Sequence, residues 1–237
     1  MVSKTESSFG AKLRRAQDLL TYLKKFKDYN PPRSQETFAE MSTLINGIIA
    51  INATESSQYE NYKVSVANRQ AAFSKKSGSI EKLLSPIKGA IEAQYGKKST
   101  ESISVSAIIK KMRATKLIKI PADPTKQTQE KTLSQSERSY GSITQYFNDI
   151  VNTLTQFSDY NPSSATLKVS ALQALATQLT TLNDTVAEKV QVLKTTRTSR
   201  QTQYLELKDR VQRIKSYVKA QYGNDSNEFK LIKGLSI

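Results

Sequence analysis

Apolar residues recur along this chain with the spacing of amphipathic helices. Between residues 9 and 26 they fall every three or four positions, and a similar period continues over residues 34–51 and 54–95. Only 8 Gly and 6 Pro interrupt the 237 positions, and these are the residues that most often end helices. The pattern therefore predicts an all-α protein with long helices.

One segment of the chain occurs twice. The sequence Phe-x-Asp-Tyr-Asn-Pro stands at residues 26–31 and again at 157–162, an offset of 131 positions. The residues that the two copies share include Asp28, Tyr29, Asn30, Pro31 and Arg69 in the first, and Asp159, Tyr160, Asn161, Pro162 and Arg200 in the second. The offset continues on both sides without a gap, so we predict a tandem duplication. Residues 1–120 are expected to form a first helical repeat with a basic C-terminal extension, 121–137 a polar linker, and 138–237 the second repeat.

Each repeat is expected to be a three-helix unit. Asp-Tyr-Asn-Pro ends the first helix, because the residue before a proline is pushed out of the helical region. Asn52-Ala53-Thr54 and Asn183-Asp184-Thr185 have the chemistry of a tight turn between the second and third helices. Thr185 with Glu188 matches a capping box at the start of the third helix.

The third helix of each repeat is predicted to be the longest, over residues 54–95 and 185–222. Its far half carries an apolar stripe that outruns the first two helices, and an exposed stripe of that length is unfavourable in water. We expect the partner third helix and the tails at 99–114 and 226–237 to cover it, giving an elongated, pseudo-twofold bundle. The first copy has about four extra residues near Ser85-Pro86, and Gly78 and Pro86 are expected to bend or break the helix.

The segment between the repeats differs in composition from the helices. Residues 121–137 are polar, contain two prolines and show no periodicity, which predicts an exposed linker. A Lys-Leu-Ile-Lys string occurs at 116–119 and again at 230–233. The sequence leaves open whether these strings match structurally or pair as short strands.

The missing residue types exclude several kinds of chemistry. The chain has no Cys and no His, so the usual zinc sites, Ser-His and Cys-His nucleophiles and neutral-pH proton shuttles are absent. No cofactor, no metal and no enzymatic activity are expected. The longest strongly apolar run, residues 44–51, is far shorter than the ~20 residues that a membrane span needs. The N-terminal residues lack an apolar signal segment, so a cytoplasmic location is expected.

The net charge of +15 is concentrated in one part of the sequence. Between residues 75 and 119 the basic side chains greatly outnumber the acidic ones. They are Lys75, Lys76, Lys82, Lys88, Lys97, Lys98, Lys110, Lys111, Arg113, Lys116 and Lys119. This segment is interpreted either as a polyanion-binding patch that contacts nucleic acid phosphates, or as a solvated lysine-rich face. Aromatic residues are sparse in it, which disfavours stacking on single-stranded bases.

Arg69 and Arg200 lie at matching positions in the third helices. If the three helices of a repeat alternate in direction, Arg69 is level with the end of the first helix, within reach of Asp28 and less easily of Asp18. The two arginines are interpreted either as an anion-binding pair or as Arg-Asp pairs that fix the helix register. The second interpretation is favoured, because partly buried charges are usually paired.

The repeated pattern resembles a set of uncharacterised bacterial hypothetical proteins with two helical repeats. The likeness rests on Phe-x-Asp-Tyr-Asn-Pro, on Asn52 or Asn183, on Arg69 or Arg200, and on the segment at 218–223 with Ser226 and Glu228-Phe229. It covers nearly the whole chain. It brings no activity, cofactor or binding residue to this sequence, and implies only the two-repeat helical organisation.

Two functions are compatible with these observations. The first is a non-catalytic structural or interaction protein, a scaffold or adaptor with a basic surface, that binds a protein partner or associates with itself. The second is a sequence-nonspecific nucleic-acid or polyanion-binding protein that uses the basic segment.

Overall fold

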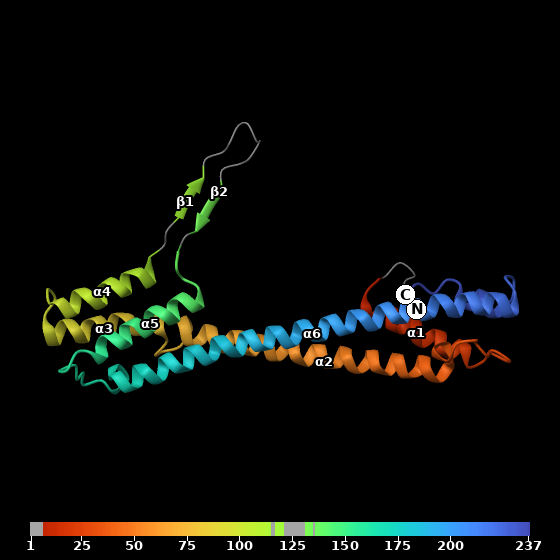
Figure 1. Ribbon diagram of the computed structural model, residues 1–237, viewed down its shortest axis with the longest axis horizontal. Helices are drawn as coiled ribbons and strands as arrows, with labels where there is room; N and C mark the ends of the chain where they lie inside the picture. Colours follow the sequence, from red (N-terminus) through yellow and green to blue (C-terminus); the bar gives the residue numbers. More distant parts are fainter. Residues whose placement is uncertain (1–6, 115–116, 121–130, 135) are drawn as a thin grey trace. The chain divides into compact units, whose positions relative to one another are not determined.

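The computed structural model describes residues 7–114, 117–120, 131–134 and 136–237 (Figure 1). Its helices are α1 (Phe9–Leu23), α2 (Phe38–Gln70), α3 (Ile80–Tyr95), α4 (Thr100–Arg113), α5 (Tyr140–Thr155), α6 (Val169–Tyr222) and α7 (Asn227–Ile232). Short 3-10 turns, η1 (Ser34–Glu36) and η3 (Ala165–Leu167), precede α2 and α6, and a π-helical turn, η2 (Ala71–Lys75), follows α2. The prediction of a helical protein is confirmed.

Two strands interrupt the helical pattern. β1 (Leu117–Ile120) pairs antiparallel with β2 (Lys131–Ser134), with Leu117 opposite Ser134. The predicted linker is thus a strand in residues 131–134, while residues 121–130 and 135 lie outside the described ranges. The two Lys-Leu-Ile-Lys strings do not match structurally, because the first supplies β1 and the second supplies the end of α7.

The predicted turns at residues 52–54 and 183–185 are wrong, because α2 and α6 continue straight through them. The hydroxyls of Thr54 and Thr185 donate to the carbonyls of Ala50 and Thr181, four residues earlier, so they follow the helix and do not cap it. The capping box at Thr185 is therefore absent. The second and third predicted helices of each repeat are one continuous helix.

The chain folds into two compact units, and each draws on both halves of the sequence. Unit 1 comprises residues 1–61 and 190–237, and unit 2 comprises residues 62–189. Since α2 and α6 do not turn back, the third predicted helix of a repeat cannot pack on its own first two helices. This differs from the expected three-helix lobes of residues 1–120 and 138–237.

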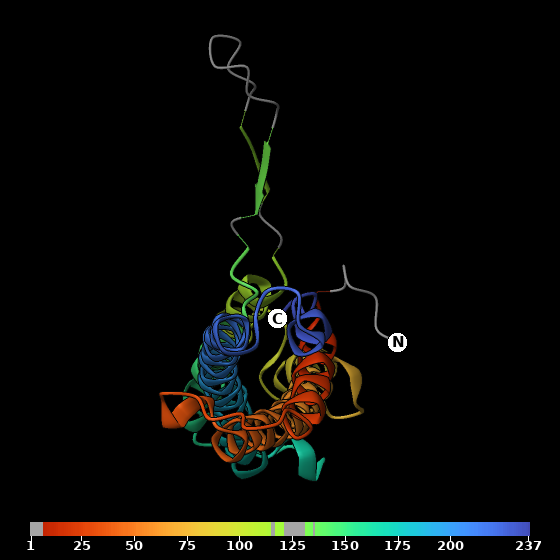
Figure 2. The same ribbon diagram turned by 90° about the vertical axis from the view of Figure 1, so that its right-hand side faces the viewer.

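The core of unit 1 lies between α1, the first part of α2 and the second part of α6. Leu19, Ile48 and Ile214 are fully buried there, and Ile232 of α7 joins the same cluster. Figure 2 shows α7 beside α1. The apolar stripe of α6 is thus covered by α1, by the first part of α2 and by α7. The tail at 226–237 contributes as predicted, but the predicted cover by the partner third helix is wrong, because residues 54–95 are not part of this cluster.

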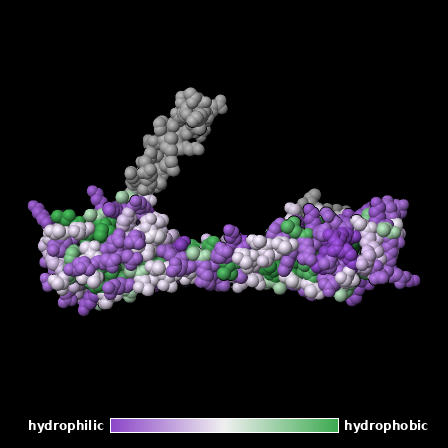
Figure 3. All heavy atoms as spheres, in the orientation of Figure 1, coloured by the Kyte–Doolittle hydropathy of each residue, from purple (hydrophilic) through white to green (hydrophobic). Residues whose placement is uncertain are grey.

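Unit 2 buries its core between α3, α4, α5 and the first part of α6. Ile87, Phe147 and Leu179 have no exposed surface, and Val105 and Ile109 of α4 close the cluster. α3 and α4 form a helical hairpin, and α5 packs against α4 (Figure 1). On the face shown in Figure 3, hydrophobic residues reach the surface of unit 2 in small groups between polar ones.

The break between α2 and α3 lies at Gly78 and not at Pro86. Gly78 has φ of +80°, a left-handed conformation that glycine adopts at little cost, whereas α3 runs on through Pro86. The buried residues Phe73 and Tyr204 are 131 positions apart, but Ile80 and Leu207 are 127 apart. If these pairs are equivalent, the four extra residues of the first copy fall within 74–79, not near residue 85. They end one long helix and start another.

Candidate anion-binding site

The repeated Asp-Tyr-Asn-Pro segment forms a turn that is tied to the following helix in both units. The Tyr29 hydroxyl donates to the Glu36 carbonyl at 2.8 Å, and the Tyr160 hydroxyl donates to the Leu167 carbonyl at 3.1 Å. Burial raises the pKa of Tyr160 to about 12, and also raises the pKa of Tyr29. Both hydroxyls therefore stay protonated and donate their bonds throughout the physiological pH range.

The remaining residues of this turn shape the backbone. Asp28 has φ of +57°, and its carbonyl accepts a hydrogen bond from Gln221 Nε2 at 2.8 Å. Pro31 is buried, Asn30 is exposed, and the Asn30 carbonyl accepts a hydrogen bond from the Tyr217 hydroxyl. In unit 2, the Asp159 carbonyl and the Asn161 amide both bind the side chain of Gln94, and Pro162 is half-buried. These contacts tie the backbone of the turn to α6 in unit 1 and to α3 in unit 2.

The two repeat-shared arginines each lie over the ring of the first residue of a helix. The Arg200 guanidinium is 4.6 Å from the centre of the Phe9 ring, and the Arg69 guanidinium is 4.1 Å from that of Tyr140. Arg200 also forms an ion pair with Glu55, with Nη1 2.8 Å from Oε2. The structure gives both arginines partners other than the expected aspartates.

Arg69 lacks the carboxylate that Arg200 has. The residue 131 positions after Glu55 is Val186, which is buried in unit 2. The Nε atom of Arg69 is buried and has no hydrogen-bond partner among the described residues. Each of the two arginines therefore contacts an aromatic ring, but only the charge of Arg200 is neutralised by a carboxylate among the described residues.

The α3–α4 hairpin separates the predicted basic patch into two groups. Arg113 Nη2 donates to Ser85 Oγ at 2.8 Å, which brings the end of α4 next to the beginning of α3. The exposed side chains near this end are Lys76, Lys82, Lys110, Lys111 and Arg113, whereas Lys97 and Lys98 are exposed at the opposite end of the hairpin. The 16-residue α3 is about 24 Å long, and a Debye length is only about 8 Å at physiological salt. The two groups therefore act separately on a small anion.

The other predicted patch residues contribute less. Lys88 pairs with Glu92 on α3 at 3.6 Å. Lys75 ends the π-helical turn η2 and Lys119 lies in β1, while Lys116 lies outside the described residues.

Unit 1 and unit 2 have nearly equal net charge, but their arginine side chains differ in whether they form ion pairs with carboxylates. Unit 1 carries 18 basic and 11 acidic residues, and unit 2 carries 18 and 10. Arginines of unit 1 form ion pairs with carboxylates; they are Arg14, Arg33, Arg197, Arg200, Arg210 and Arg213. The three arginines of unit 2, Arg69, Arg113 and Arg138, pair with no carboxylate of the described ranges. Guanidinium groups available for anions are therefore concentrated in unit 2.

A cavity of about 610 Å³ lies in unit 2 beside two of these arginines, and we call it the α3–α5 cavity. Its apolar lining comes from Phe73, Ile80, Leu84, Met112, Tyr140 and Ile143. Its polar lining comes from Ser74, Glu81, Arg113, Ser136 and Arg138. The volume is in the range of small-molecule sites, which combine apolar walls with a few convergent polar groups.

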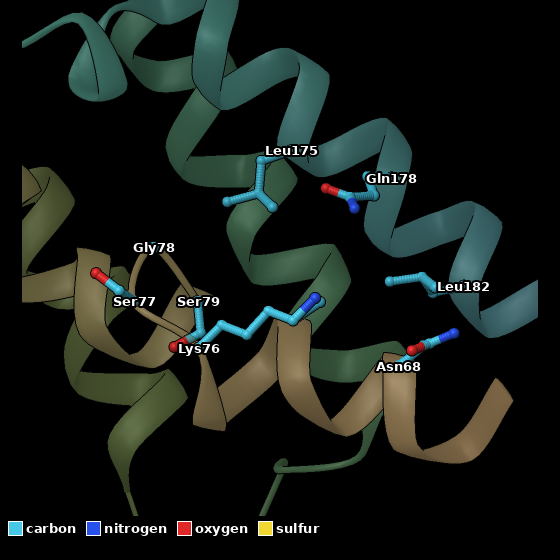
Figure 4. A pocket seen from close by; sticks show the side chains of 9 residues that line it. Asn68, Lys76, Ser77, Gly78, Ser79, Leu175, Gln178 and Leu182 are labelled. Atoms are coloured by element: carbon cyan, nitrogen blue, oxygen red, sulfur yellow. The ribbon is translucent and has the colours of Figure 1, made fainter. Parts of the chain in front are cut away.

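A second cavity of unit 2, about 410 Å³, is more polar (Figure 4). The Lys76 side chain extends from the loop along the space between that loop and α6, where Gln178 and Leu182 lie. Ser79 is also part of this lining, but its Oγ atom is buried and has no partner among the described residues. The cavity offers one ammonium group and neutral amides, which is less than the α3–α5 cavity offers.

One cavity of unit 1 differs in its charge. It measures about 430 Å³ and lies near the Pro31-Pro32 turn. Its two guanidinium groups are already neutralised, because Arg33 pairs with Glu36 and Arg213 with Asp209. An incoming anion would have to compete with those carboxylates.

Comparison with protein-family models, with curated proteins and with solved structures gives no significant match to this chain. None of the helices that the structure describes combines the length and hydropathy needed to cross a membrane. Within the described ranges, no three carboxylates gather into a group that could hold a metal ion. Fold and site together define a helical protein whose unit 2 has exposed basic side chains beside a partly apolar cavity.

The sequence did not identify Arg138 or Tyr140 as site residues. Arg138 lies two residues before α5, next to the predicted linker, and Tyr140 is the first residue of α5. Their proximity to Arg113 and Phe73 depends on the packing of α5 against the α3–α4 hairpin, through α4. The one sequence signal was the alignment of Tyr140 with Phe9 at the repeat offset.

Proposed function

We propose that this chain is a non-catalytic interaction protein whose unit 2 binds polyanionic partners. One observation carries the proposal. Among the described residues, the arginines of unit 2 have no carboxylate partners, whereas arginines of unit 1 form ion pairs. Paired guanidinium groups must lose a partner before they bind a phosphate, but Arg113 and Arg138 need not.

The basic end of the α3–α4 hairpin provides the contact surface. Lys110, Lys111 and Arg113 occupy the last turn of α4, and Lys82 follows the start of α3. These side chains are exposed, so they reach phosphates without a conformational change. Contacts with phosphates do not depend on the base sequence of the nucleic acid. Their free energy comes from charge neutralisation and the release of counterions from the polyanion. A scaffold role with a protein partner or self-association stays a prediction, as does the cytoplasmic location.

A charge-reversal comparison tests the proposal. We expect the Lys110→Glu, Lys111→Glu, Arg113→Glu variant to bind random double-stranded DNA at least about 30-fold more weakly at ~0.1 M salt, because three phosphate contacts are lost. The matched control is Lys24→Glu, Lys25→Glu, Lys27→Glu, which changes the same charge at exposed positions of unit 1. Its affinity should fall less than about 5-fold.

Salt dependence gives a second measurement. For the unaltered chain, elution from heparin and DNA affinity should both fall steeply with salt, with a log-log slope of about −3 to −4 if three or four phosphates are contacted. The proposal is wrong if affinity is independent of salt, or if both charge-reversal variants weaken binding equally.

A further inference from the structure

We propose that the α3–α5 cavity is a binding site for a small organic anion with an apolar body, such as an alkyl carboxylate. The cavity provides both halves of this ligand chemistry. Leu84 and Met112 are almost completely buried and form part of its apolar wall, while Arg113 and Arg138 supply guanidinium groups at its polar side. The inference rests on the shape and lining of the cavity and does not require polyanion binding.

The electrostatics of the cavity favour an anion. The lining contains two guanidinium groups and one carboxylate, that of Glu81, and none of the three forms an ion pair with another described residue. Arg113 is held by the neutral Ser85 hydroxyl, so its charge is not compensated there. A carboxylate accepts two parallel hydrogen bonds from a guanidinium, which makes arginine the best side chain for this task.

The start of α5 strengthens this preference. Ser139 caps the helix by accepting a hydrogen bond from the Ser142 amide at 3.0 Å, and Tyr140 and Ile143 of the first turn line the cavity. The first N–H groups of a helix have no partner within the helix, and they give its N-terminus a partial positive charge. The partial positive charge of the helix end adds to that of the two arginines. The site itself is identified by the arginines and the apolar wall.

Two aromatic rings in contact form one wall of the cavity. Phe73 and Tyr140 meet edge to face, with ring centres 4.7 Å apart, and Arg69 covers the Tyr140 ring from its own position on α2. Arg69 therefore fixes the wall on which the apolar body of the ligand would rest. We assign it a positioning role.

The cavity is built from segments in which the two sequence halves differ. Ser74 lies in the segment 74–79, which is four residues longer than its counterpart between Tyr204 and Leu207, and Met112 and Arg113 belong to the last turn of α4. The corresponding helix of the second half, α7, has six residues against fourteen in α4. Among the described residues, a site of this composition therefore belongs to unit 2 alone.

Titration of the full chain with two amphiphiles of equal tail length tests the ligand class. We expect decanoate to bind one site with a dissociation constant of about 0.01–1 mM by calorimetry. Decyltrimethylammonium should bind at least about 10-fold more weakly, because the guanidinium groups repel it. Equal binding of the two amphiphiles, or no binding of either, would overturn the proposal.

Variants locate the site. Arg138→Gln should weaken decanoate binding by about 5- to 10-fold, whereas Arg213→Gln, the same change beside the cavity of unit 1, should change it less than about 2-fold. Ile143→Trp fills the cavity without changing the charge, so it should abolish decanoate binding and leave heparin elution unchanged. Ser74→Phe serves the same purpose if circular dichroism shows that Ile143→Trp is misfolded. Unchanged decanoate binding in a folded cavity-filling variant would refute the site, whatever the result with heparin.

Discussion

Glu55 Oε2 accepts a hydrogen bond from Arg200 Nη1 at 2.8 Å, joining α2 to α6 within unit 1. The other oxygen of the same carboxylate accepts one from Arg197 Nε at 2.7 Å. Only 13% of the Glu55 side chain is exposed, so this ion pair is better shielded from water than the exposed pairs along single helices. It joins two helices that are far apart in the sequence.

The pH dependence of stability should reflect this pair. Hydrogen bonding from Arg197, together with the charges of both arginines, lowers the pKa of Glu55 below its ordinary value of 4.5. A carboxyl with a lowered folded-state pKa stabilises the fold above the unfolded-state pKa, and this contribution is lost as pH falls through the folded-state pKa. We expect Glu55→Gln to cost about 1–2 kcal/mol at pH 7 and progressively less below pH ~4. Urea unfolding at a series of pH values measures both quantities.

An exposed pair provides the control for this measurement. Glu206 and Arg210 lie four residues apart on α6, and 45% of the Glu206 side chain is exposed. Glu206→Gln should cost no more than about 0.5 kcal/mol at pH 7. Equal losses in Glu55→Gln and Glu206→Gln would contradict a special role for the shielded pair.

The continuity of α2 gives a second prediction. Ala53 lies in the middle of this helix and is exposed, so a substitution there changes the backbone without disturbing the core. Ala53→Pro should destabilise the chain by about 3 kcal/mol or more, because proline removes a helical hydrogen bond and clashes with the preceding turn. Ala53→Gly should cost about 1 kcal/mol.

The same substitution distinguishes the continuous helix from a turn. A tight turn at residues 52–54 would tolerate proline or gain from it, since proline suits several turn positions. A loss of less than about 1 kcal/mol in Ala53→Pro would therefore contradict the continuous helix. Far-ultraviolet circular dichroism should show whether helix content falls with the stability.

The sequence predicted the helices well because their signal is local. Apolar residues three or four positions apart identify the buried faces of α1 and α5, and Gly223, with φ of +96°, ends α6 where expected. The predicted turns were wrong because the side chains of Asn and Thr can form hydrogen bonds in two settings. They can cap the start of a helix, or they can bond to a carbonyl or a neighbouring side chain from within a helix. Asn52 donates to the Tyr204 hydroxyl at 2.9 Å, a partner 152 positions away that no local pattern reveals.

The candidate site was predicted only in part, for a related reason. The basic residues of α4 are visible in the sequence, and Arg113 was among them. The cavity beside it needs Arg138 and Tyr140 from α5, whose position depends on which helices share a unit. Once α2 is known to continue, the exchange of helices between the sequence halves follows, but no local pattern of residues argues against a turn at 52–54.

A double-mutant cycle tests whether the two units are structurally equivalent, as a tandem duplication requires. If Val186 in unit 2 is the counterpart of Glu55 in unit 1, a glutamate at position 186 lies next to Arg69. Val186→Glu buries a carboxylate, so it should destabilise the chain by several kcal/mol when Arg69 is replaced by Met, and by about 1–2 kcal/mol less when Arg69 is present. Urea unfolding of the unaltered chain, both single variants and the double variant gives the coupling energy. A coupling energy within about 0.3 kcal/mol of zero would show that the position of Val186 does not correspond to that of Glu55.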